Sequence, residues 1–365
     1  SYKPWNLVWD ESTSSLLFNH STSEELYSVR VDKHGEAVGA IESLGWASSF
    51  TDFDYSAATG QYVIVSRTRD SRIVALDVTS DDPFTPIVQG YTAIRSLAAS
   101  RDANVLYFVE ILADRGMQIH AYSKDDSVFT PLPEDIRYRD RRDPTPFPLS
   151  DRYMVFRGYD GRNEGLYYYD RDRMQYQSLV SDPSSDLIYD HLNWNPAGTA
   201  LYSILNPSPP STRDRSLVRL NIRSDEEGLS VTSIDTLLSL PDLQHTIPGP
   251  ENRYVFYVQG NERTSGDIYL FDLITGNTRH VTNGTWPALG NGGKNLYFYR
   301  NAAIWVVRDW QEAIGTTITP EHIADTPTGD LTLASDHPLV LAGDTLFLAY
   351  SINTGTEILW SYTER

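Results

Sequence analysis

One pattern of apolar residues recurs eight times along the 365 residues of this chain, at a spacing of roughly 41 to 54 residues. Its members are Leu16–Phe18, Tyr62–Val65, Val105–Phe108, Tyr153–Phe156, Ala200–Ser203, Tyr254–Tyr257, Leu296–Tyr299 and Leu346–Ala349. Repeats of this length are typical of arrays in which each repeat is one supersecondary unit that packs against its neighbours. Because the pattern covers almost the whole chain, it limits the possible fold more than any other feature.

A second apolar run follows each first run after a polar loop. The second runs are Leu26–Val29, Ile73–Leu76, Ile119–Tyr122, Leu166–Tyr169, Leu217–Leu220, Ile268–Phe271, Ile304–Val307 and Ile358–Ser361. Short segments precede the first runs, such as Leu97–Ser100, and others follow the second runs, such as Arg279–Thr282. Four short strands per repeat, joined by turns, predict an all-β fold of radially arranged four-stranded sheets, which is a β-propeller.

The number of repeats predicts the number of blades. We expect eight blades in a single domain that spans residues 1–365, and the alternative is seven blades with one degenerate repeat. The last repeat reaches Arg365 without an outer strand. We expect Ser1–Pro4 to supply this strand, which closes the ring and removes an exposed sheet edge.

The sixth repeat carries a resemblance to a known family. Asp267–Gly276 followed by His280–Gly284 resembles the TolB-type, WD40-like (PD40) propeller repeat. Asn195–Tyr202 and Asn291–Tyr297 are similar to a turn of that family, although Ala197 stands where Asp is usual. The resemblance implies the fold over nearly the whole chain. Such propellers serve as scaffolds, peptidase gates, carbohydrate lyases and small-molecule enzymes, so the resemblance does not imply one function.

Charge and composition exclude several classes of partner. A formal net charge of -19 disfavours nucleic acid and anionic lipid, and no apolar run approaches the roughly 18 residues of a membrane span. The absence of cysteine excludes thiolate catalysis and Cys-based zinc sites. The chain opens on Ser1 without Met and carries two glycosylation sequons, at Asn19 and Asn283. These features predict the secretory pathway, with a cytoplasmic location as the alternative.

The sequence holds no self-contained catalytic motif. The nucleophile elbow, the H-E-x-x-H helix, the P-loop, the EF-hand loop and the dinucleotide fingerprint are all missing. The histidines are scattered and form no H-x-H pair, so we expect no metal and no cofactor. This departs from the His-rich manganese site of propeller oligogalacturonate lyases, but it leaves metal-free lyases open.

Candidate site residues follow from the fold, because the loops that enter the first strand and join the middle strands of each blade meet at one mouth of the channel. The candidates for catalysis are His245, Arg157, Arg139 and His191. The candidates for substrate binding are Trp46, Tyr91, Arg67, Arg95, Glu110, Tyr159, Trp286 and Arg300. Arginine binds carboxylates and enolates with two parallel hydrogen bonds, so these residues predict a cationic funnel in an acidic protein.

Each candidate also has a structural interpretation. The Arg-rich run from Arg137 to Asp143 is equally consistent with a solvated loop that pairs its charges locally. His191 and His245 are also consistent with hydrogen-bonded structural histidines. Trp46 and Trp286 are also consistent with packing at the neck of the propeller.

Three functions remain open at this point. The first is an enzyme whose central funnel catalyses cofactor-free elimination, dehydration or cyclisation of an unsaturated or oxygenated metabolite. It has a general similarity to fungal propeller enzymes of the hetero-Diels–Alderase kind. The second is a polysaccharide lyase or carbohydrate-binding propeller with a uronate-like ligand, and the third is a protein-interaction scaffold. A closed apolar pocket favours the first function, and an open groove favours the second.

Overall fold

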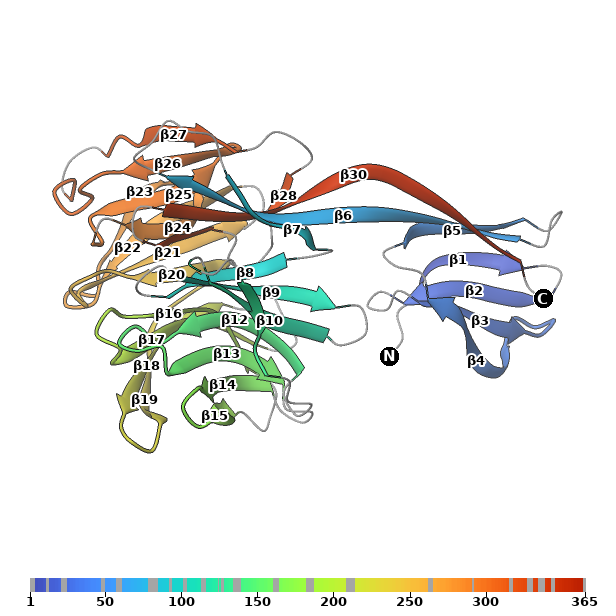
Figure 1. Ribbon diagram of the computed structural model, residues 1–365, viewed down its shortest axis with the longest axis horizontal. Helices are drawn as coiled ribbons and strands as arrows, with labels where there is room; N and C mark the ends of the chain where they lie inside the picture. Colours follow the sequence, from blue (N-terminus) through green and yellow to red (C-terminus); the bar gives the residue numbers. More distant parts are fainter. Residues whose placement is uncertain are drawn as a thin grey trace. The chain divides into compact units, whose positions relative to one another are not determined.

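The computed structural model describes the following residues: 4–10, 13–20, 25–46, 50–56, 61–77, 85–91, 94–100, 104–112, 116–123, 125, 128–133, 139–159, 164–181, 187–207, 214–261, 265–290, 292–314, 318–326, 331–333, 339–342 and 345–363. Within these residues the chain forms strands β1 to β30 and no helix (Figure 1). The fold is therefore all-β, and its sheets have the antiparallel order of propeller blades.

Six sheets contain four consecutive strands each. The first holds β1 (Pro4–Asp10), β2 (Ser15–His20), β3 (Glu25–Val31) and β4 (Ala37–Trp46). The second holds β8 (Ile94–Ala99), β9 (Val105–Leu112), β10 (Gly116–Ser123) and β11 (Val128–Pro131). The third holds β12 (Arg139–Pro146), β13 (Tyr153–Tyr159), β14 (Glu164–Asp170) and β15 (Gln175–Ser181).

The remaining sheets continue the same pattern. The fourth holds β16 (Leu187–Trp194), β17 (Ala200–Pro207), β18 (Arg215–Ser224) and β19 (Leu229–Leu240). The fifth holds β20 (Leu243–Pro248), β21 (Tyr254–Asn261), β22 (Ser265–Asp272) and β23 (Thr278–Asn283). The sixth holds β24 (Thr285–Gly290), β25 (Asn295–Arg300), β26 (Ala303–Val307) and β27 (Glu321–Asp325).

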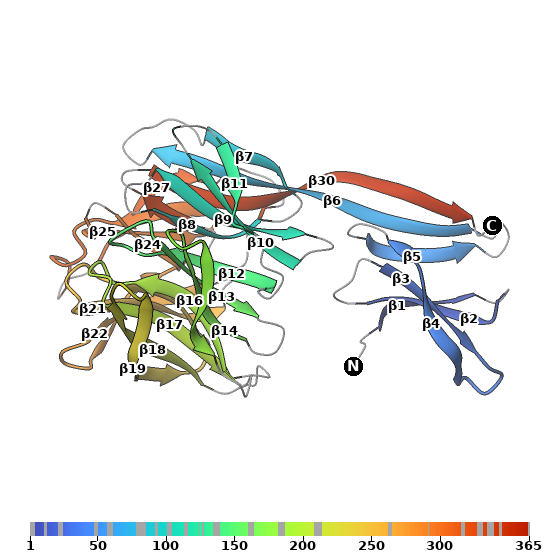
Figure 2. The same ribbon diagram turned by 60° about the horizontal axis from the view of Figure 1, so that its bottom comes forward.

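A seventh sheet combines strands from the two ends of the chain. It contains β5 (Phe50–Ser56), β6 (Gln61–Asp77), β7 (Thr85–Tyr91), β28 (Leu331–Leu333), β29 (Leu339–Ala342) and β30 (Thr345–Thr363). Strands β6 and β30 lie side by side at its centre (Figures 1 and 2). All sixteen predicted apolar runs fall within strands, but the second and eighth repeats share this sheet. The described residues therefore form seven sheets, which is the number of the seven-bladed alternative and not the expected eight.

The chain divides into two compact units. The smaller unit comprises Ser1–Asp70 and Ile352–Arg365, and the larger unit comprises Ser71–Ser351. The division falls inside β6 and β30, so each of these long strands contributes to both units. The smaller unit contains the sheet β1–β4 together with β5, the part of β6 up to Asp70 and the part of β30 from Ile352. A single domain over residues 1–365 stays a prediction.

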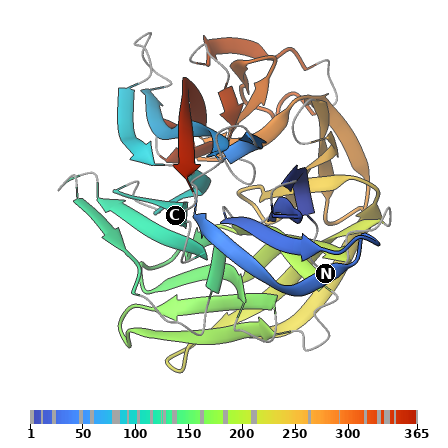
Figure 3. The same ribbon diagram turned by 90° about the vertical axis from the view of Figure 1, so that its right-hand side faces the viewer.

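The larger unit is a closed ring of blades. Its inner strands are β8, β12, β16, β20, β24 and β29. Each of them contacts the next, and β29 contacts β8 to complete the circle. Figure 3 shows the sheets of this unit arranged radially around a common centre. Buried aromatic and aliphatic side chains fill the space between neighbouring blades, as Phe156 and Tyr167 do beside Val109.

The ring closes within this seventh sheet. There β29 pairs with β30, β30 lies next to β6, and β7 pairs with β6. One blade of the larger unit is thus built from strands at both ends of the segment Ser71–Ser351. We expected Ser1–Pro4 to close the ring, but Ser1–Lys3 lie outside the described residues, and Pro4 pairs with His20 in the first sheet.

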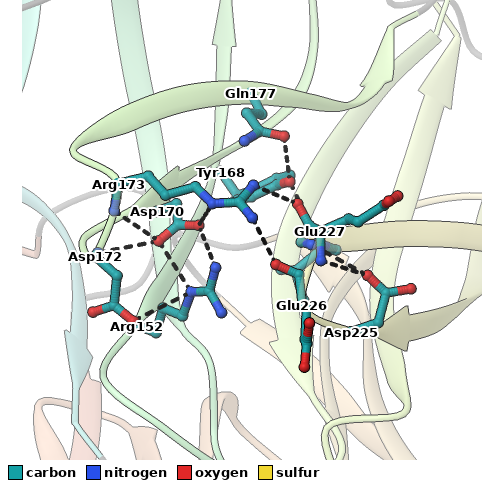
Figure 4. Close-up of polar contacts among 11 residues, drawn as sticks. Arg152, Tyr168, Asp170, Asp172, Arg173, Gln177, Asp225, Glu226 and Glu227 are labelled. Atoms are coloured by element: carbon teal, nitrogen blue, oxygen red, sulfur yellow. Dashed lines mark hydrogen bonds and ion pairs between the residues drawn. The ribbon is translucent and has the colours of Figure 1, made fainter.

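Hairpins of adjacent blades are also joined by polar contacts (Figure 4). The Arg173 guanidinium, in the β14–β15 turn, donates hydrogen bonds to the carbonyl oxygens of Glu226 at 2.7 Å and Glu227 at 2.9 Å, in the β18–β19 turn. On its own blade, the buried Asp170 carboxylate accepts bonds from Arg152 Nε at 3.1 Å and Arg152 Nη2 at 2.9 Å. The Arg173 hydrogen bonds thus connect two neighbouring hairpins, and the Arg152–Asp170 pair lies within one of the two blades.

Candidate functional site

Five of the six inner strands of the larger unit carry the same backbone irregularity. In each, one residue that is not glycine has a positive φ: Ser96 at 46° in β8, Asp143 at 50° in β12, His191 at 57° in β16, His245 at 44° in β20 and Trp286 at 49° in β24. Each of these residues falls within a shift of register against the next strand. A left-handed conformation at a residue other than glycine costs energy and persists only where the surrounding structure enforces it. Its repetition shows that these five blades have the same kind of bulge. We call the five bulge residues together the bulge ring.

The side chains of the bulge ring are buried and meet in pairs. Their exposed fractions are 1% for Ser96, 4% for Asp143, 6% for His191, 2% for His245 and 5% for Trp286. Ser96 Oγ donates a hydrogen bond to Asp143 Oδ1 at 2.9 Å. The ring centroids of His191 and His245 lie 4.2 Å apart, and those of His245 and Trp286 lie 6.3 Å apart at an interplanar angle of 75°. Buried acid–base groups thus occupy the equivalent bulge position in three successive blades, and two of them, His191 and His245, are in contact.

A cavity of about 300 Å³ lies next to the bulge ring. All six inner strands contribute to its wall, mostly through the residues that follow the bulge in each strand, such as Ala98, Leu192 and Pro287. The wall is dominated by Leu, Ala, Pro, Val and Ile, with Trp194 as an aromatic member. Among the described residues of this wall, Asp143 is the ionisable one, and it belongs to the bulge ring as well. A mostly apolar pocket with few polar groups is the usual form of a small-molecule site.

Arg157 lies in β13 and is held by carboxylates. Its guanidinium donates to Glu164 Oε1 at 2.7 Å and forms an ion pair with Asp190. Burial lowers the pKa of Arg157, but the charges of Asp190, Asp143 and Glu164 raise it, and the net shift is upward. The positive charge of Arg157 is therefore compensated within the protein, and the side chain is not among those that line the cavity. For Arg157 this differs from the cationic funnel that the sequence predicts, whereas the side chains of Arg67, Arg95 and Arg139 lie outside the described part of the structure.

The structure places the other predicted residues as follows. His191, His245 and Trp286 come together in the bulge ring. Only the backbone is described for Arg139, which lies opposite Tyr159, for Arg95, opposite Val109, and for Tyr91, opposite Ser71. Trp46 and Arg67 belong to the smaller unit, and again only their backbone is described. None of the seven predicted site residues whose side chains are described lines this cavity.

Two further predicted residues, Glu110 and Arg300, have contacts within their own blades, and a third, Tyr159, is exposed. Glu110 Oε2 lies 2.9 Å from His120 Nε2, and burial raises the pKa of Glu110 and lowers the pKa of His120. The Arg300 guanidinium lies over the Trp305 ring, 3.9 Å from its centroid. Tyr159 is exposed at the end of β13. Local pairing explains the position of the Glu110 side chain, and stacking on Trp305 explains that of Arg300.

Sequence reasoning missed Ser96, and it treated Asp143 as a residue that pairs locally. A signal for both exists in the spacing of the repeats. Each bulge residue stands nine or ten residues ahead of the first apolar run of its repeat, as Asp143 does before Tyr153. In the last repeat this position is His337, which lies outside the described residues.

Comparisons with known proteins add likeness in fold. No family model matches the chain, and no curated protein matches it. TolB from Acinetobacter baumannii is similar, with a TM-score of 0.47 and 11% identity over 94% of this chain and 79% of that chain. Oligogalacturonate lyase from Vibrio parahaemolyticus gives 0.44 and 12% over 88% and 89%, and a luciferin-regenerating enzyme gives 0.45 and 14% over 73% and 93%.

The described residues also bear on a metal site and on a membrane span. Among these residues, no group of three or more His, Cys, Asp or Glu side chains is arranged to hold a metal ion. In the same part of the chain, no helix has the length and apolar character needed to cross a membrane.

Proposed function

We propose that the central channel of the larger unit is the site of a small-molecule enzyme that catalyses a cofactor-free elimination, dehydration or cyclisation. The observation that carries this proposal is the position of Asp143. It joins a cavity of about 300 Å³ to a buried ring that holds two further acid–base side chains. Proton transfer by positioned side chains is the chemistry that such groups supply without a cofactor.

The residues of the channel divide the work between binding and proton transfer. The apolar wall, with Trp194, accommodates the hydrocarbon part of an unsaturated substrate. Asp143 contacts the substrate and accepts or returns a proton. His191 and His245 stand in ring contact with each other at the same level of the channel, where they relay or hold that proton.

The character of the wall supports this function over recognition of a uronate. A uronate carries a carboxylate and many hydroxyl groups, and its binding requires cationic and hydrogen-bonding partners. The wall is mostly apolar, and its ionisable member is a carboxylic acid. Arg157, a predicted anion-binding residue whose side chain is described, is already held by Asp190 and Glu164.

A stability screen against unsaturated and oxygenated small molecules tests the proposal. Ligands that bind the folded state raise the melting temperature by mass action, and hits are then incubated with the protein and followed by mass spectrometry. Ala98→Leu places extra atoms in the cavity and is expected to abolish the shifts. Ala197→Leu, in the exposed β16–β17 turn, is the matched control. Equal shifts in both variants contradict a site in the channel.

The proton-transfer step is tested separately on any molecule that is converted. His245→Gln and Asp143→Asn remove one acid–base group each while keeping hydrogen-bonding capacity. Both are expected to lower turnover by about 100-fold or more, which is the usual contribution of general acid–base catalysis. Binding without conversion by the unaltered protein favours a carrier or receptor instead of an enzyme.

A further inference from the structure

The inner strands of the larger unit are edge strands, and side chains of the cavity wall hydrogen-bond to their backbone carbonyl groups. Trp194 Nε1, in β16, donates to the Thr145 carbonyl oxygen in β12 at 3.3 Å. Asn193 Nδ2, also in β16, donates to the Thr246 carbonyl oxygen in β20 at 2.6 Å. The Thr145 hydroxyl donates to the Asp143 carbonyl oxygen at 2.9 Å. Because buried carbonyl groups need a donor, these three side chains use donor hydrogens within the protein.

Proline removes further donors from the wall. The segment 143–148 contributes five residues to the cavity, and three of them are Pro144, Pro146 and Pro148. Proline has no backbone N–H and occurs within sheets almost only on edge strands such as β12. Most wall residues of this segment therefore offer a carbonyl oxygen and no N–H.

Asn193 has an acceptor atom whose orientation is fixed by its bond to Thr246. A carbonyl oxygen only accepts, so the side-chain atom that faces Thr246 has to be the nitrogen, and Oδ1 takes the other branch of the amide. The Asn193 side chain is half-buried and lines the cavity. Within the described structure no donor reaches its Oδ1. A ligand that supplies a hydrogen to this oxygen gains a bond, and the amide does not have to reorient to accept it.

We infer that the channel site takes small apolar molecules that carry a hydroxyl group, and that Asn193 Oδ1 selects them by accepting the hydroxyl hydrogen. This inference rests on the proposed small-molecule site and specifies the class of its substrate as an apolar alcohol. The apolar wall, with Trp194, binds the hydrocarbon part. A ketone of the same skeleton brings a second acceptor to Asn193 and loses its bonds to water without replacement. An alcohol is also the class of substrate that a dehydration consumes.

Three probes with one bicyclic skeleton test this selection. 1-Indanol carries a hydroxyl group that donates and accepts, 1-indanone carries a carbonyl group that only accepts, and indane carries neither. Their affinities are measured by calorimetry with the full chain. We expect 1-indanol to bind at least about fivefold more tightly than 1-indanone, which corresponds to one neutral hydrogen bond. Indane binds through the apolar wall alone and reports whether the cavity is intact.

Two variants of Asn193 separate acceptance of the ligand from the bond to Thr246. Asn193→Ala is expected to abolish the preference for the alcohol while indane still binds. Asn193→Asp keeps an acceptor oxygen but replaces the Nδ2 donor, so it is expected to retain the preference. Asn221→Ala is the matched control, because this asparagine of the same sheet bonds to Ser233 and Asp235 in β19, and it keeps the preference.

Each contrary result has a distinct meaning. A preference that persists in Asn193→Ala, or one that is lost in both Asn193 variants while indane still binds, overturns the role of Oδ1. Equal affinity of the unaltered protein for the alcohol and the ketone, or tighter binding of the ketone, overturns the substrate class, while binding of indane leaves the channel site in place. Absence of binding by all three probes, together with no effect of Ala98→Leu on any ligand in the stability screen, overturns both the inference and the proposed site.

Discussion

The imidazole rings of His191 and His245 lie with their centroids 4.2 Å apart, although they belong to different blades. Both residues have a left-handed backbone, with φ of 57° and 44°. The contact therefore depends on a bulge in β16 and on another in β20, and neither strand would place its histidine there with a regular backbone. This is how the fold converts a repeated backbone feature into a cluster of side chains.

The cost of this backbone can be measured at His245. His245→Asn and His245→Val both remove the imidazole, but Asn tolerates a left-handed backbone whereas the branched Val side chain does not. We expect the Val variant to be less stable than the Asn variant by about 1–2 kcal/mol, measured by urea denaturation. Equal stability of the two variants contradicts an enforced left-handed conformation at this position.

A second close relationship joins adjacent blades at Gly228. A Cβ atom at this position would overlap the Tyr168 hydroxyl oxygen, and the φ of 142° disfavours a side chain in any case. Gly228→Ala is expected to displace Tyr168 from Gln177, to which its hydroxyl donates at 2.7 Å, and to cost about 1–3 kcal/mol of stability.

A double-mutant cycle identifies the cause of this loss. Tyr168→Phe removes the hydroxyl that meets the new methyl group, so part of the loss is expected to disappear in the double variant. Strict additivity of the two changes assigns the whole effect to the backbone conformation of Gly228 instead.

The positions of the strands could be predicted from the sequence, because alternation and apolar runs are local properties. The number of blades could not. The second repeat has the polar stretch Ser66–Arg72 between its two runs, which we interpreted as a loop. This stretch contains no Gly, Pro or Asn to force a turn, and in the structure it continues as the middle of β6. The second repeat, in β6, thereby joins the eighth repeat, in β30, in one sheet.

The candidate site was only partly predictable for a related reason. His191, His245 and Trp286 were selected because their loops were expected to meet, and the structure brings them together. Arg157 was selected by the same argument, but Asp190 and Glu164 hold its charge. Which partner a long cationic side chain finds depends on contacts between strands, and the local sequence does not contain them. The bulges lack the glycine that usually marks a left-handed residue.

Arg173 provides a test of the contacts between hairpins. Arg173→Ala removes two hydrogen bonds to the carbonyl oxygens of Glu226 and Glu227. Because these contacts are exposed, we expect a loss of about 0.5–1.5 kcal/mol in the free energy of unfolding. Arg223→Ala removes an exposed arginine that pairs with Asp225 in the same region, and it is expected to have a negligible effect. Equal effects of the two changes would show that the contacts between hairpins add no stability.

Asp170 makes the stability of this region depend on pH. Burial raises the pKa of Asp170. Hydrogen bonds from Arg152 and from the backbone N–H of Arg173 lower this pKa by a larger amount, so the net pKa lies below the ordinary 3.8. A carboxyl group whose pKa is lower in the folded state stabilises the protein above the unfolded pKa, and this contribution is lost as the pH falls through the folded pKa. Asp170→Asn is therefore expected to cost about 1–3 kcal/mol near neutral pH and progressively less below about pH 4, where the unaltered protein loses the same interaction.

Urea denaturation at a series of pH values measures the difference, with Asp172→Asn as the exposed control. A difference that stays constant down to the lowest pH at which the protein folds would mean that the Arg152 pair does not require an ionised Asp170.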